Sequence, residues 1–479
     1  MSEYQAVIGL EVHVELNTRT KMFCACAIDF GGEPNVRTCP VCLGQPGSLP
    51  VVNREAVRSA IQLGLALGCD IAPSSQFHRK NYFYPDMPKD YQISQYDIPI
   101  CADGKLEITT SDGTDTIGIT RVHIEEDTGK SVHVGTSGRI HGADYSLVDY
   151  NRAGIPLLEI VSEPDVRSAE QAQAYLTELR AIVLALGISD AKLEEGSMRC
   201  DANISVHRPG EPYGTRAEVK NMNSVRSLGR AITYEVARQI DVLSSGGTVV
   251  QETRHWDEDA GTTSTLRVKE ATEDYRYFPD PDLVLVEPAA EWVDELRAAL
   301  PELPAQLRAR LATQHGLGTE QIATLASSGL VKVFSDAVEA GAGTNEAANW
   351  LTNNVVGYAA EHGVEPASLP VDGAKLAELV ALVDDGTLST KLARQVLEDV
   401  LAGKGAPKQV VADRGLEQLS DTDELTAIVD QVIAENEAAA QKVRDGNQKA
   451  IGALVGGVMK ATQGKANPQL VNQLIAERL

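Results

Sequence analysis

Hydrophobic and polar residues alternate without interruption from Ile8 to Leu16. One set of positions includes Leu10 and Val12, and the other includes Glu11 and His13. This period of two predicts a β-strand with one buried face and one polar face. Positions two apart on a strand are separated by about 7 Å, so Glu11 and His13 are close enough to bind one hard cation. A solvated outer face of an ordinary sheet is the alternative.

A second alternating segment, Thr120 to Asp127, ends in three acidic residues. Adjacent carboxylates repel one another, so a metal ion or neighbouring cations are expected there, unless the segment is an acidic surface turn. Strict alternation puts Glu125 on the face of His123 and Glu126 on the other face. Which of the two points into a site depends on where the strand bends.

Two helices are predicted from capping residues around hydrophobic segments. Asn53 is suited to begin a helix that ends at Gly68, and Ser168, with Gln171 three residues later, begins another that ends at Gly187. These helices are expected to pack against the strands.

The segment Met198 to Asn223 has the pattern of a hairpin whose polar face carries Arg199 and Asp201 on one arm and Lys220 on the other. Asn221 follows at the strand end, where its amide can donate hydrogen bonds. Such a mixed-charge surface is either a solvated sheet face or a ligand platform.

Aromatic residues alternate with cations and amides between His78 and Ile100, and again between Asp274 and Asp282. Aromatic faces beside such groups can stack a base and hold a phosphate, although an aromatic minicore has the same composition. The candidate ligand contacts in these segments are Lys80, Asn81, Tyr82 and Arg276. Further acid and base groups are Arg152 in a turn, and Glu252 with Arg254.

Four cysteines form two close pairs, Cys24 with Cys26 and Cys39 with Cys42. Two thiolate pairs across a short loop are typical of a tetrahedral zinc knuckle, in which four sulfur ligands leave no position for a substrate. The expected zinc role is therefore structural. The other three cysteines of the seven are expected to be buried thiols.

The 479 residues exceed one hydrophobic core, and domain sizes near 150 residues suggest about three domains. The patterns predict an α+β cradle with a mixed or antiparallel sheet over residues 1–293, an all-α helical domain over 294–405, and a small helical tail domain over 406–479. The composition is that of a soluble globular protein, and no secretory, transit or membrane segment is apparent, so a cytoplasmic protein is expected.

A net charge of −25 disfavours nucleic-acid binding over the whole surface but permits a local basic patch. Residues 441–479 hold six Lys/Arg against two acids, whereas residues 411–440 hold Arg414 against eight acids. The basic tail is the expected contact with a nucleic-acid backbone. Its candidate residues are Lys442, Arg444, Lys449, Lys460 and Lys465.

Together these segments closely resemble the B-subunit family of bacterial-type glutamyl/aspartyl-tRNA amidotransferases. The matching segments run through the whole chain and are not shared by generic nucleotide-binding folds. They are Ile8 to Leu16, the cysteine pairs, Arg79 to Asp86, His123 to Lys130, Asp149 to Pro156, Gly196 to Ser205, Lys220 to Ser224, Gln251 to Arg254, Asp274 to Leu283 and Ala466 to Asn472.

The resemblance implies a protein that uses ATP and Mg²⁺ to phosphorylate the side-chain carboxylate of Glu on glutamine tRNA, or of Asp on asparagine tRNA. Ammonia then displaces the phosphate. In the family, a partner amidase supplies the ammonia, a small third protein completes the heterotrimer, and the tail domain contacts the mischarged tRNA. Some members lack the cysteine pairs, so zinc is optional in the family.

The family's metal ligands carry over to His13, Glu126 and Glu252, with Glu11 beside them, and these four are the expected catalytic residues. The resemblance thus favours Glu126 over Glu125. Because Mg²⁺ prefers oxygen ligands, His13 would bind it through water, or the site would accept Mn²⁺. Candidates for phosphates and the acceptor end are Lys80, Arg152, Arg199, Lys220 and Arg254.

Two other functions fit parts of the sequence. An ATP-dependent ligase that amidates a free small carboxylic acid would need the cradle and not the basic tail. A non-catalytic zinc-knuckle scaffold for tRNA would need no carboxylate cluster.

Overall fold

The computed structural model describes residues 3–29, 31–135, 143–268, 275–416, 422–444, 450–462, 466 and 468–479. The chain forms two compact units, Met1–Pro304 and Ala305–Leu479. Lys449 and Lys465 of the predicted tRNA contacts lie outside the described residues.

A nine-stranded mixed sheet is the framework of the first unit, with strand order β13-β12-β11-β10-β1-β9-β6-β5-β2. Its paired neighbours are antiparallel except β11 and β12, which are parallel. The strands are β1 (Gln5–Glu15), β2 (Asp70–Ile71), β5 (Cys101–Thr110), β6 (Gly113–Glu126), β9 (Pro156–Ser162), β10 (Met198–His207), β11 (Ala217–Lys220), β12 (Glu252–Asp257) and β13 (Thr262–Val268).

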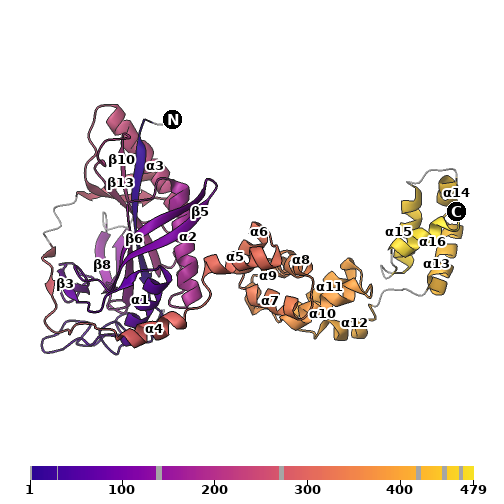
Figure 1. Ribbon diagram of the computed structural model, residues 1–479, viewed down its shortest axis with the longest axis horizontal. Helices are drawn as coiled ribbons and strands as arrows, with labels where there is room; N and C mark the ends of the chain where they lie inside the picture. The colour runs from indigo at the N-terminus through magenta and orange to yellow at the C-terminus, as the bar shows by residue number, and fades with distance from the viewer. Residues whose placement is uncertain are drawn as a thin grey trace. The chain divides into compact units, whose positions relative to one another are not determined.

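The hydrophobic face of this sheet packs against helices α1 (Arg54–Ala66), α2 (Ala169–Leu186) and α3 (Val225–Ser244) (Figure 1). The predicted caps are confirmed: Asn53 and Ser168 accept backbone hydrogen bonds at the starts of α1 and α2, and Gly187 ends α2 in the left-handed conformation. Helix α4 (Ala290–Ala298) adds Val293 to the same core.

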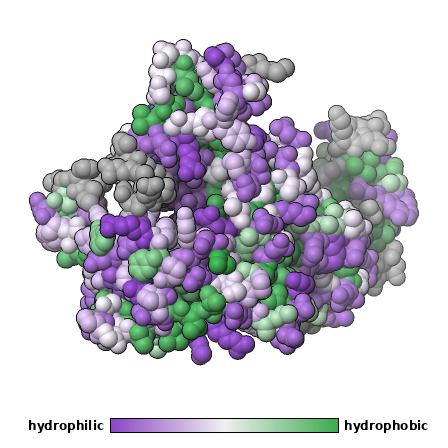
Figure 2. Space-filling model, turned by 60° about the vertical axis from the view of Figure 1, so that its left-hand side comes forward, coloured by the Kyte–Doolittle hydropathy of each residue, from purple (hydrophilic) through white to green (hydrophobic). Residues whose placement is uncertain are grey.

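Most of the surface in Figure 2 is hydrophilic, with hydrophobic residues in small groups. None of the described helices is long and apolar enough to span a membrane.

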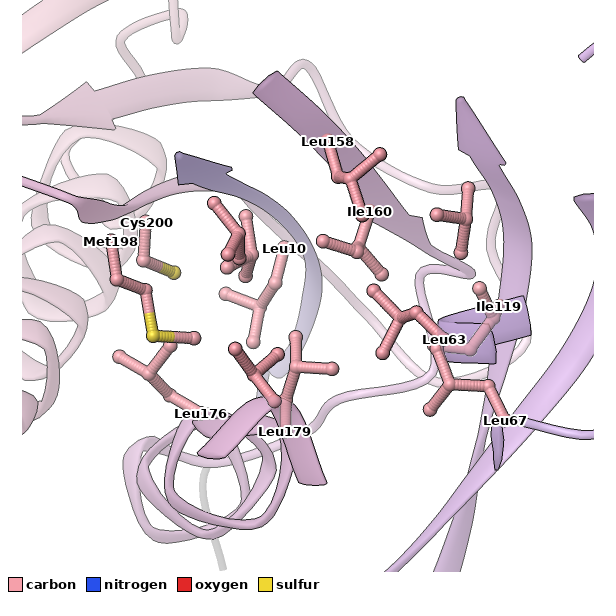
Figure 3. Close-up of a cluster of buried hydrophobic side chains, with 14 of the residues drawn as sticks. Leu10, Leu63, Leu67, Ile119, Leu158, Ile160, Leu176, Leu179, Met198 and Cys200 are labelled. Carbon is pink, nitrogen blue, oxygen red and sulfur yellow. The ribbon is translucent and has the colours of Figure 1, made fainter. Parts of the chain in front are cut away.

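Alternation along β1 gives the sheet its two chemically different sides. Leu10 and Val12 are buried in the core, where Leu10 lies near Cys200 of β10 and Leu179 of α2 (Figure 3). The intervening residues face away from the helices, as the pattern predicts. Strand register then decides which polar side chains meet on that second side.

Two smaller sheets are formed by other described strands of the first unit. A three-stranded sheet in the order β14-β3-β4 joins Phe278–Pro279, His78–Asn81 and Tyr91–Ser94. Strand β4 packs beside β6 on the polar side of the large sheet. A two-stranded sheet pairs β7 (Lys130–Gly135) with β8 (Ala143–Asp149).

The described part of the second unit is helical, and it contains two separate hydrophobic clusters. Val410 and Val411 of α12 belong to the first of these clusters, although the predicted boundary places them in the tail. The separation into a helical and a tail domain stays a prediction. The helices are α5 (Pro304–His315), α6 (Thr319–Ser327), α7 (Val331–Glu339), α8 (Thr344–Asn349), a π-helix (Trp350–Val355), α9 (Val356–His362), a 3₁₀ turn (Pro366–Ser368), α10 (Gly373–Asp384), α11 (Thr390–Leu401), α12 (Pro407–Arg414), α13 (Thr422–Glu435), α14 (Glu437–Arg444), α15 (Ile451–Ala461) and α16 (Pro468–Ala476).

The predicted fold class, an α+β cradle followed by helical structure, is confirmed.

Candidate functional site

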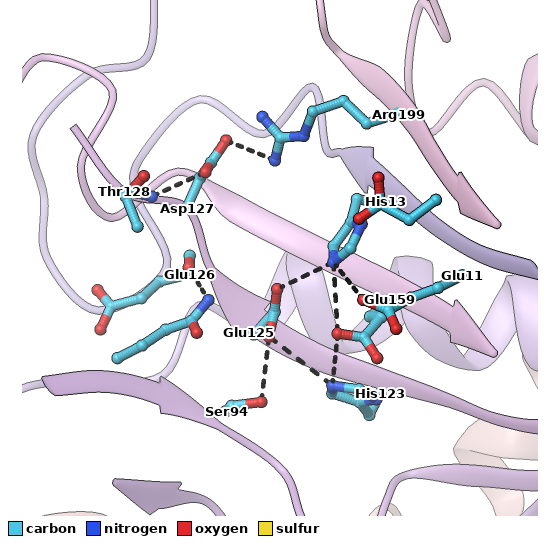
Figure 4. A network of polar contacts seen from close by, with 12 residues as sticks. Glu11, His13, Ser94, His123, Glu125, Glu126, Asp127, Thr128, Glu159 and Arg199 are labelled. Atoms are coloured by element: carbon cyan, nitrogen blue, oxygen red, sulfur yellow. Dashed lines mark hydrogen bonds and ion pairs between the residues drawn. The ribbon is translucent and has the colours of Figure 1, made fainter. Parts of the chain in front are cut away.

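A cluster of carboxylates surrounds His13 at the centre of the polar side of the large sheet. Its Nε2 atom lies 3.6 Å from Glu11 Oε1, 3.8 Å from Glu125 Oε1 and 3.4 Å from Glu159 Oε2 (Figure 4). Glu159 is the register partner of His13 on β1 and of His123 on β6. Three strands therefore place these groups together through ordinary pairing.

Potential ligand atoms meet here in two overlapping groups, each within 4.8 Å. One comprises Glu11, His13 and Asp201, and the other comprises His13, Glu125 and Glu159. The structure therefore brings together the predicted pair Glu11 and His13, with Asp201 from β10. Glu125 and Glu159 were not among the predicted ligands.

The cluster is buried, and its charges depend on one another. Burial alone would lower the pKa of His13, but its hydrogen bond to Glu159 and the charges of Glu159, Glu125 and Glu11 raise the pKa to about 9. For Glu159, burial opposes ionisation, but His123, His13 and Lys80 hold its pKa well below the usual range. Burial, with the charge of Glu159, raises the pKa of Glu11. An added cation would relieve the repulsion among these carboxylates.

His123 and Arg121 form a second layer that was not predicted to belong to the site. Arg121 Nε donates to His123 Nδ1 at 3.3 Å. The Nε2 atom of His123 lies 3.6 Å from Glu159 Oε2 and 3.8 Å from Glu125 Oε2. The arrangement orients both carboxylates from the side opposite His13.

Lys80 approaches the same carboxylates from β3 of the three-stranded sheet. Burial would lower its pKa, but the charges of Glu125 and Glu159 raise it, so the ammonium form is stabilised. The Nζ atom lies 5.1 Å from the ring centre of Tyr275. Lys80 is therefore a cation between the carboxylate cluster and an aromatic segment, as its sequence context suggested.

Lys220 is a cation at the other side of the cluster, where it pairs with Asp201 and lies 3.4 Å from Glu218 Oε1. Burial would lower the pKa of Lys220, but Asp201, Glu218 and Glu11 raise it. The side chain of Lys220 is one-third exposed, so an anionic ligand could reach it.

The structure does not bring Glu126 to His13. Its Oε1 atom accepts hydrogen bonds from Lys89 Nζ and, at 2.9 Å, from the backbone N–H of Ile93, and Figure 4 shows the side chain directed away from His13. Strand β6 pairs regularly with β9 from His123 to Glu126, so alternation puts Glu125 on the side of His13. The resemblance favoured Glu126 as a metal ligand, whereas the structure places Glu125 beside His13.

Glu252 and Arg254 also lie apart from His13, on the side of the sheet covered by α3. Arg254 pairs with Glu252, and its Nε atom lies 3.3 Å from Oε2 of the fully buried Glu235. An irregularity between Thr253 and Arg254 shifts the register of β12. Among the described residues, no group of three close ligand atoms includes Glu126 or Glu252.

Arg152 and Arg199 are engaged with protein groups beside the cluster. Arg152 donates to the carbonyl oxygens of Thr128 and Gly129, each at 3.0 Å, and Arg199 Nη2 donates to Asp127 Oδ2 at 2.9 Å. Their bonds hold the loop that follows β6, and both side chains remain about one-third exposed, so the remaining N–H donors can reach a ligand.

The other predicted contacts are distributed around the aromatic segment and the hairpin. Asn81 donates to the carbonyl oxygens of Tyr275 and Arg276, and the ring of Tyr82 lies 6.0 Å from that of Tyr84. Arg276 is exposed. Asn221 adopts a positive φ of 74° and donates to Trp256 O, which supports a structural role at the strand end.

The four predicted zinc ligands meet in one group, with one sulfur atom from each within 4.8 Å of the others. They are Cys24, Cys26, Cys39 and Cys42. The Nζ atom of the buried Lys21 lies 3.8 Å from Cys42 Sγ, and the hydrogen bond from Cys24 helps lower the pKa of Cys42 to about 5. Four converging sulfur atoms fit a tetrahedral zinc ion.

In the tail, the described members of the predicted tRNA contacts lie on two helices. Lys442 and Arg444 are exposed at the end of α14, where Arg444 pairs with Glu437, and Lys460 is exposed on α15.

Comparison with known proteins gives a consistent result along the chain. A model of the GatB/GatE catalytic domain matches residues 6–294, and a model of the GatB domain matches residues 332–479. The chain is 56% identical to the B subunit of the aspartyl/glutamyl-tRNA(Asn/Gln) amidotransferase of Thermobifida fusca, over 99% of this chain and 94% of the relative. The proteins of the same name from Salinispora tropica and Frankia casuarinae are 54% and 52% identical, over 100% of this chain and 97% and 96% of theirs.

These matches cover the carboxylate cluster, the cysteine group and the helical region together, and they confirm the family that the sequence motifs suggested. The chain belongs to the GatB family, the B subunits of the tRNA-dependent aspartyl/glutamyl amidotransferases.

Proposed function

We propose that this chain activates the side-chain carboxylate of Glu on glutamine tRNA, or of Asp on asparagine tRNA, with ATP. The γ-phosphoryl group moves to a carboxylate oxygen, and ADP leaves. Ammonia then attacks the carbonyl carbon of the acyl phosphate, phosphate leaves, and an amide remains. The observation that carries the proposal is the clustering of Glu11, His13, Glu125, Glu159 and Asp201 in a chain of this family.

The ligand atoms of this cluster fit a divalent cation. Carboxylate oxygens from four strands and one imidazole lie close together, and hard cations such as Mg²⁺ and Mn²⁺ prefer such oxygen-rich sites. Glu11, Glu125, Glu159 and Asp201 would supply oxygens, and His13 would bind directly to Mn²⁺ or through water to Mg²⁺. The ion would neutralise phosphate charge during transfer.

Cationic side chains around the cluster can neutralise the charges of the phosphates and of the substrate carboxylate. Lys80 and Lys220 lie at two sides of it, and Arg121 lies beside Glu159, with Nη2 at 3.7 Å from Oε1. Most of the catalysis of phosphoryl transfer is positioning and charge neutralisation. In this proposal these cations hold the phosphates and the carboxylate in line. Glu126 and Glu252 support the framework through their pairs with Lys89 and Arg254.

The ammonia source and the tRNA contacts are proposed from the family. A partner amidase would release ammonia from glutamine, a small third protein would complete the heterotrimer, and the basic tail would contact the tRNA. Residues 1–293, 294–405 and 406–479 would act as cradle, helical and tail domains. Zinc at the four cysteines would be structural.

The experiment that tests this function measures ATP hydrolysis and amide formation with mischarged tRNA and ammonium, in place of glutamine. Glu159→Gln is expected to reduce both rates at least about 100-fold, because it removes a carboxylate from the cluster. Glu107→Gln, on the exposed side of β5, is the matched control and is expected to keep the parent rates.

Two results would reject the proposal. A parent-like rate for Glu159→Gln, in a protein whose melting curve matches that of the parent, would exclude the cluster from catalysis. If a variant without residues 411–479 amidates a free carboxylic acid at the same rate as the parent, the small-molecule ligase would be favoured.

A further inference from the structure

We propose that the stacked rings of Tyr96 and Tyr277 form a binding site for the terminal adenine of the tRNA acceptor end. This inference rests on the proposed function, since it assigns the place where the aminoacylated end enters the carboxylate cluster. It gives a role to an aromatic surface that phosphoryl transfer itself does not use.

The two tyrosines come from different segments and stack closely. Their ring centres are 4.5 Å apart, with an angle of 13° between the ring planes. Tyr96 follows β4, and Tyr277 precedes β14, so the stack spans both edge strands of the three-stranded sheet. Tyr96 is 58% exposed even though Tyr277 covers part of its ring. A base can stack on this exposed aromatic ring and so add a third ring to the pair.

Tyr277 connects this surface to the carboxylate cluster. It directly precedes Phe278, which pairs with Arg79 next to Lys80. Tyr275 packs edge-on against Tyr277 at 6.4 Å and lies over Lys80. The stack is therefore next to the place where the substrate carboxylate must react.

The chemistry of a tRNA acceptor end matches this arrangement. Its last nucleotide is single-stranded, and it carries the amino acid on its ribose, so a base held at Tyr96 would direct the amino acid toward Lys80 and the cluster. Single-stranded bases commonly bind by stacking on aromatic side chains.

The distribution of cations favours this occupant over the adenine of ATP. A triphosphate requires several positive groups, and Arg121 and Lys220 lie on β6 and β11 of the large sheet. Next to the stack, Lys80 faces the carboxylates and the exposed Arg276 directly precedes Tyr277. Asp97, whose Oδ1 atom lies 3.2 Å from His78 Nε2, adds a negative charge. The aromatic end thus suits a base with few phosphates.

The test uses the full-length chain and an uncharged tRNA transcript whose terminal adenine is replaced by fluorescent 2-aminopurine. Stacking on Tyr96 is expected to quench the fluorescence on binding. Tyr96→Leu should abolish most of the quenching and raise the dissociation constant of the transcript about tenfold, whereas Tyr96→Phe, which keeps an aromatic ring, should behave like the parent.

Tyr213→Leu is the matched control, because Tyr213 is also 58% exposed and packs edge-on against His207. It should leave the quenching unchanged. Parent-like quenching in Tyr96→Leu, or equal loss in Tyr213→Leu, would overturn the proposal.

A second arm uses 2-aminopurine riboside triphosphate in place of the transcript. We expect Tyr96→Leu to quench this nucleotide as the parent does. If Tyr96→Leu instead loses the quenching of the nucleotide and keeps that of the tRNA, the stack binds ATP and the proposal is overturned. Neither arm requires catalysis. Base stacking is measured with uncharged tRNA and phosphorylation with mischarged tRNA, so the failure of one proposal can be distinguished from the failure of the other.

Discussion

The Nε2 atom of His13 lies 3.4 Å from Oε2 of Glu159, and the two residues face each other across the paired strands β1 and β9. The imidazole thereby occupies the middle of a carboxylate cluster. Its positive form offsets the negative charge of its neighbours, and a divalent ion would serve the same purpose. Protonation of His13 and metal binding are therefore expected to compete.

The raised pKa of His13 predicts how stability depends on pH in protein freed of Mg²⁺ and Mn²⁺. The pKa of His13 rises from 6.5 to about 9 on folding, so its contribution to stability is fully present below pH 6.5 and is lost as the pH rises toward 9. The contribution is on the order of 1–3 kcal/mol. Urea unfolding between about pH 6 and pH 9.5 measures the loss, and His13→Gln should remove this part of the pH dependence. A parent curve identical to that of His13→Gln would contradict the assignment.

The buried pair between Lys89 and Glu126 predicts a structural role for Glu126. The two side chains are 5% and 3% exposed. Lys89→Met leaves the carboxylate of Glu126 without its cation, which is expected to cost about 3–5 kcal/mol of unfolding free energy. The double variant Lys89→Met with Glu126→Gln should recover part of this loss. Denaturant unfolding of the two single variants and the double variant measures the coupling, and additive effects would show that the pair is not coupled.

The cysteine group predicts a structural zinc ion. Elemental analysis of purified protein should give about one zinc per chain. Cys26→Ser should lose this zinc and lower the melting temperature by several degrees, whereas Cys101→Ala, a buried thiol outside the group, should retain it. Retention of zinc by Cys26→Ser together with an unchanged melting temperature would exclude the knuckle.

Several features of the first unit could be predicted because they depend on local sequence. Alternation from Ile8 to Leu16 correctly predicted the burial pattern of β1, and Asn53 and Ser168 cap the helices that were expected. The close spacing of the cysteine pairs also predicted their meeting. In each case, a short segment contains the information that determines the geometry.

The complete carboxylate cluster could not be predicted, because it depends on pairing between distant strands. Glu159 lies in a segment that reads as a buried hydrophobic strand, and only its register with His13 and His123 shows that it belongs to the cluster. The alternation on β6 put Glu125 on the face of His123 without assigning it to a site. For Arg254, a register shift and the position of α3 direct the side chain into a buried ion network, which no local pattern indicates.

The central claim, that the cluster around His13 binds a divalent cation, is tested most directly by Mn²⁺ binding followed by electron paramagnetic resonance. The measurement compares the full-length parent with Glu125→Gln, Glu159→Gln and Glu126→Gln, each checked for an unchanged fold by circular dichroism. We predict that the first two variants lose tightly bound Mn²⁺ and that Glu126→Gln retains it. Loss of Mn²⁺ in Glu126→Gln, with parent-like binding in Glu125→Gln and Glu159→Gln, would contradict the account.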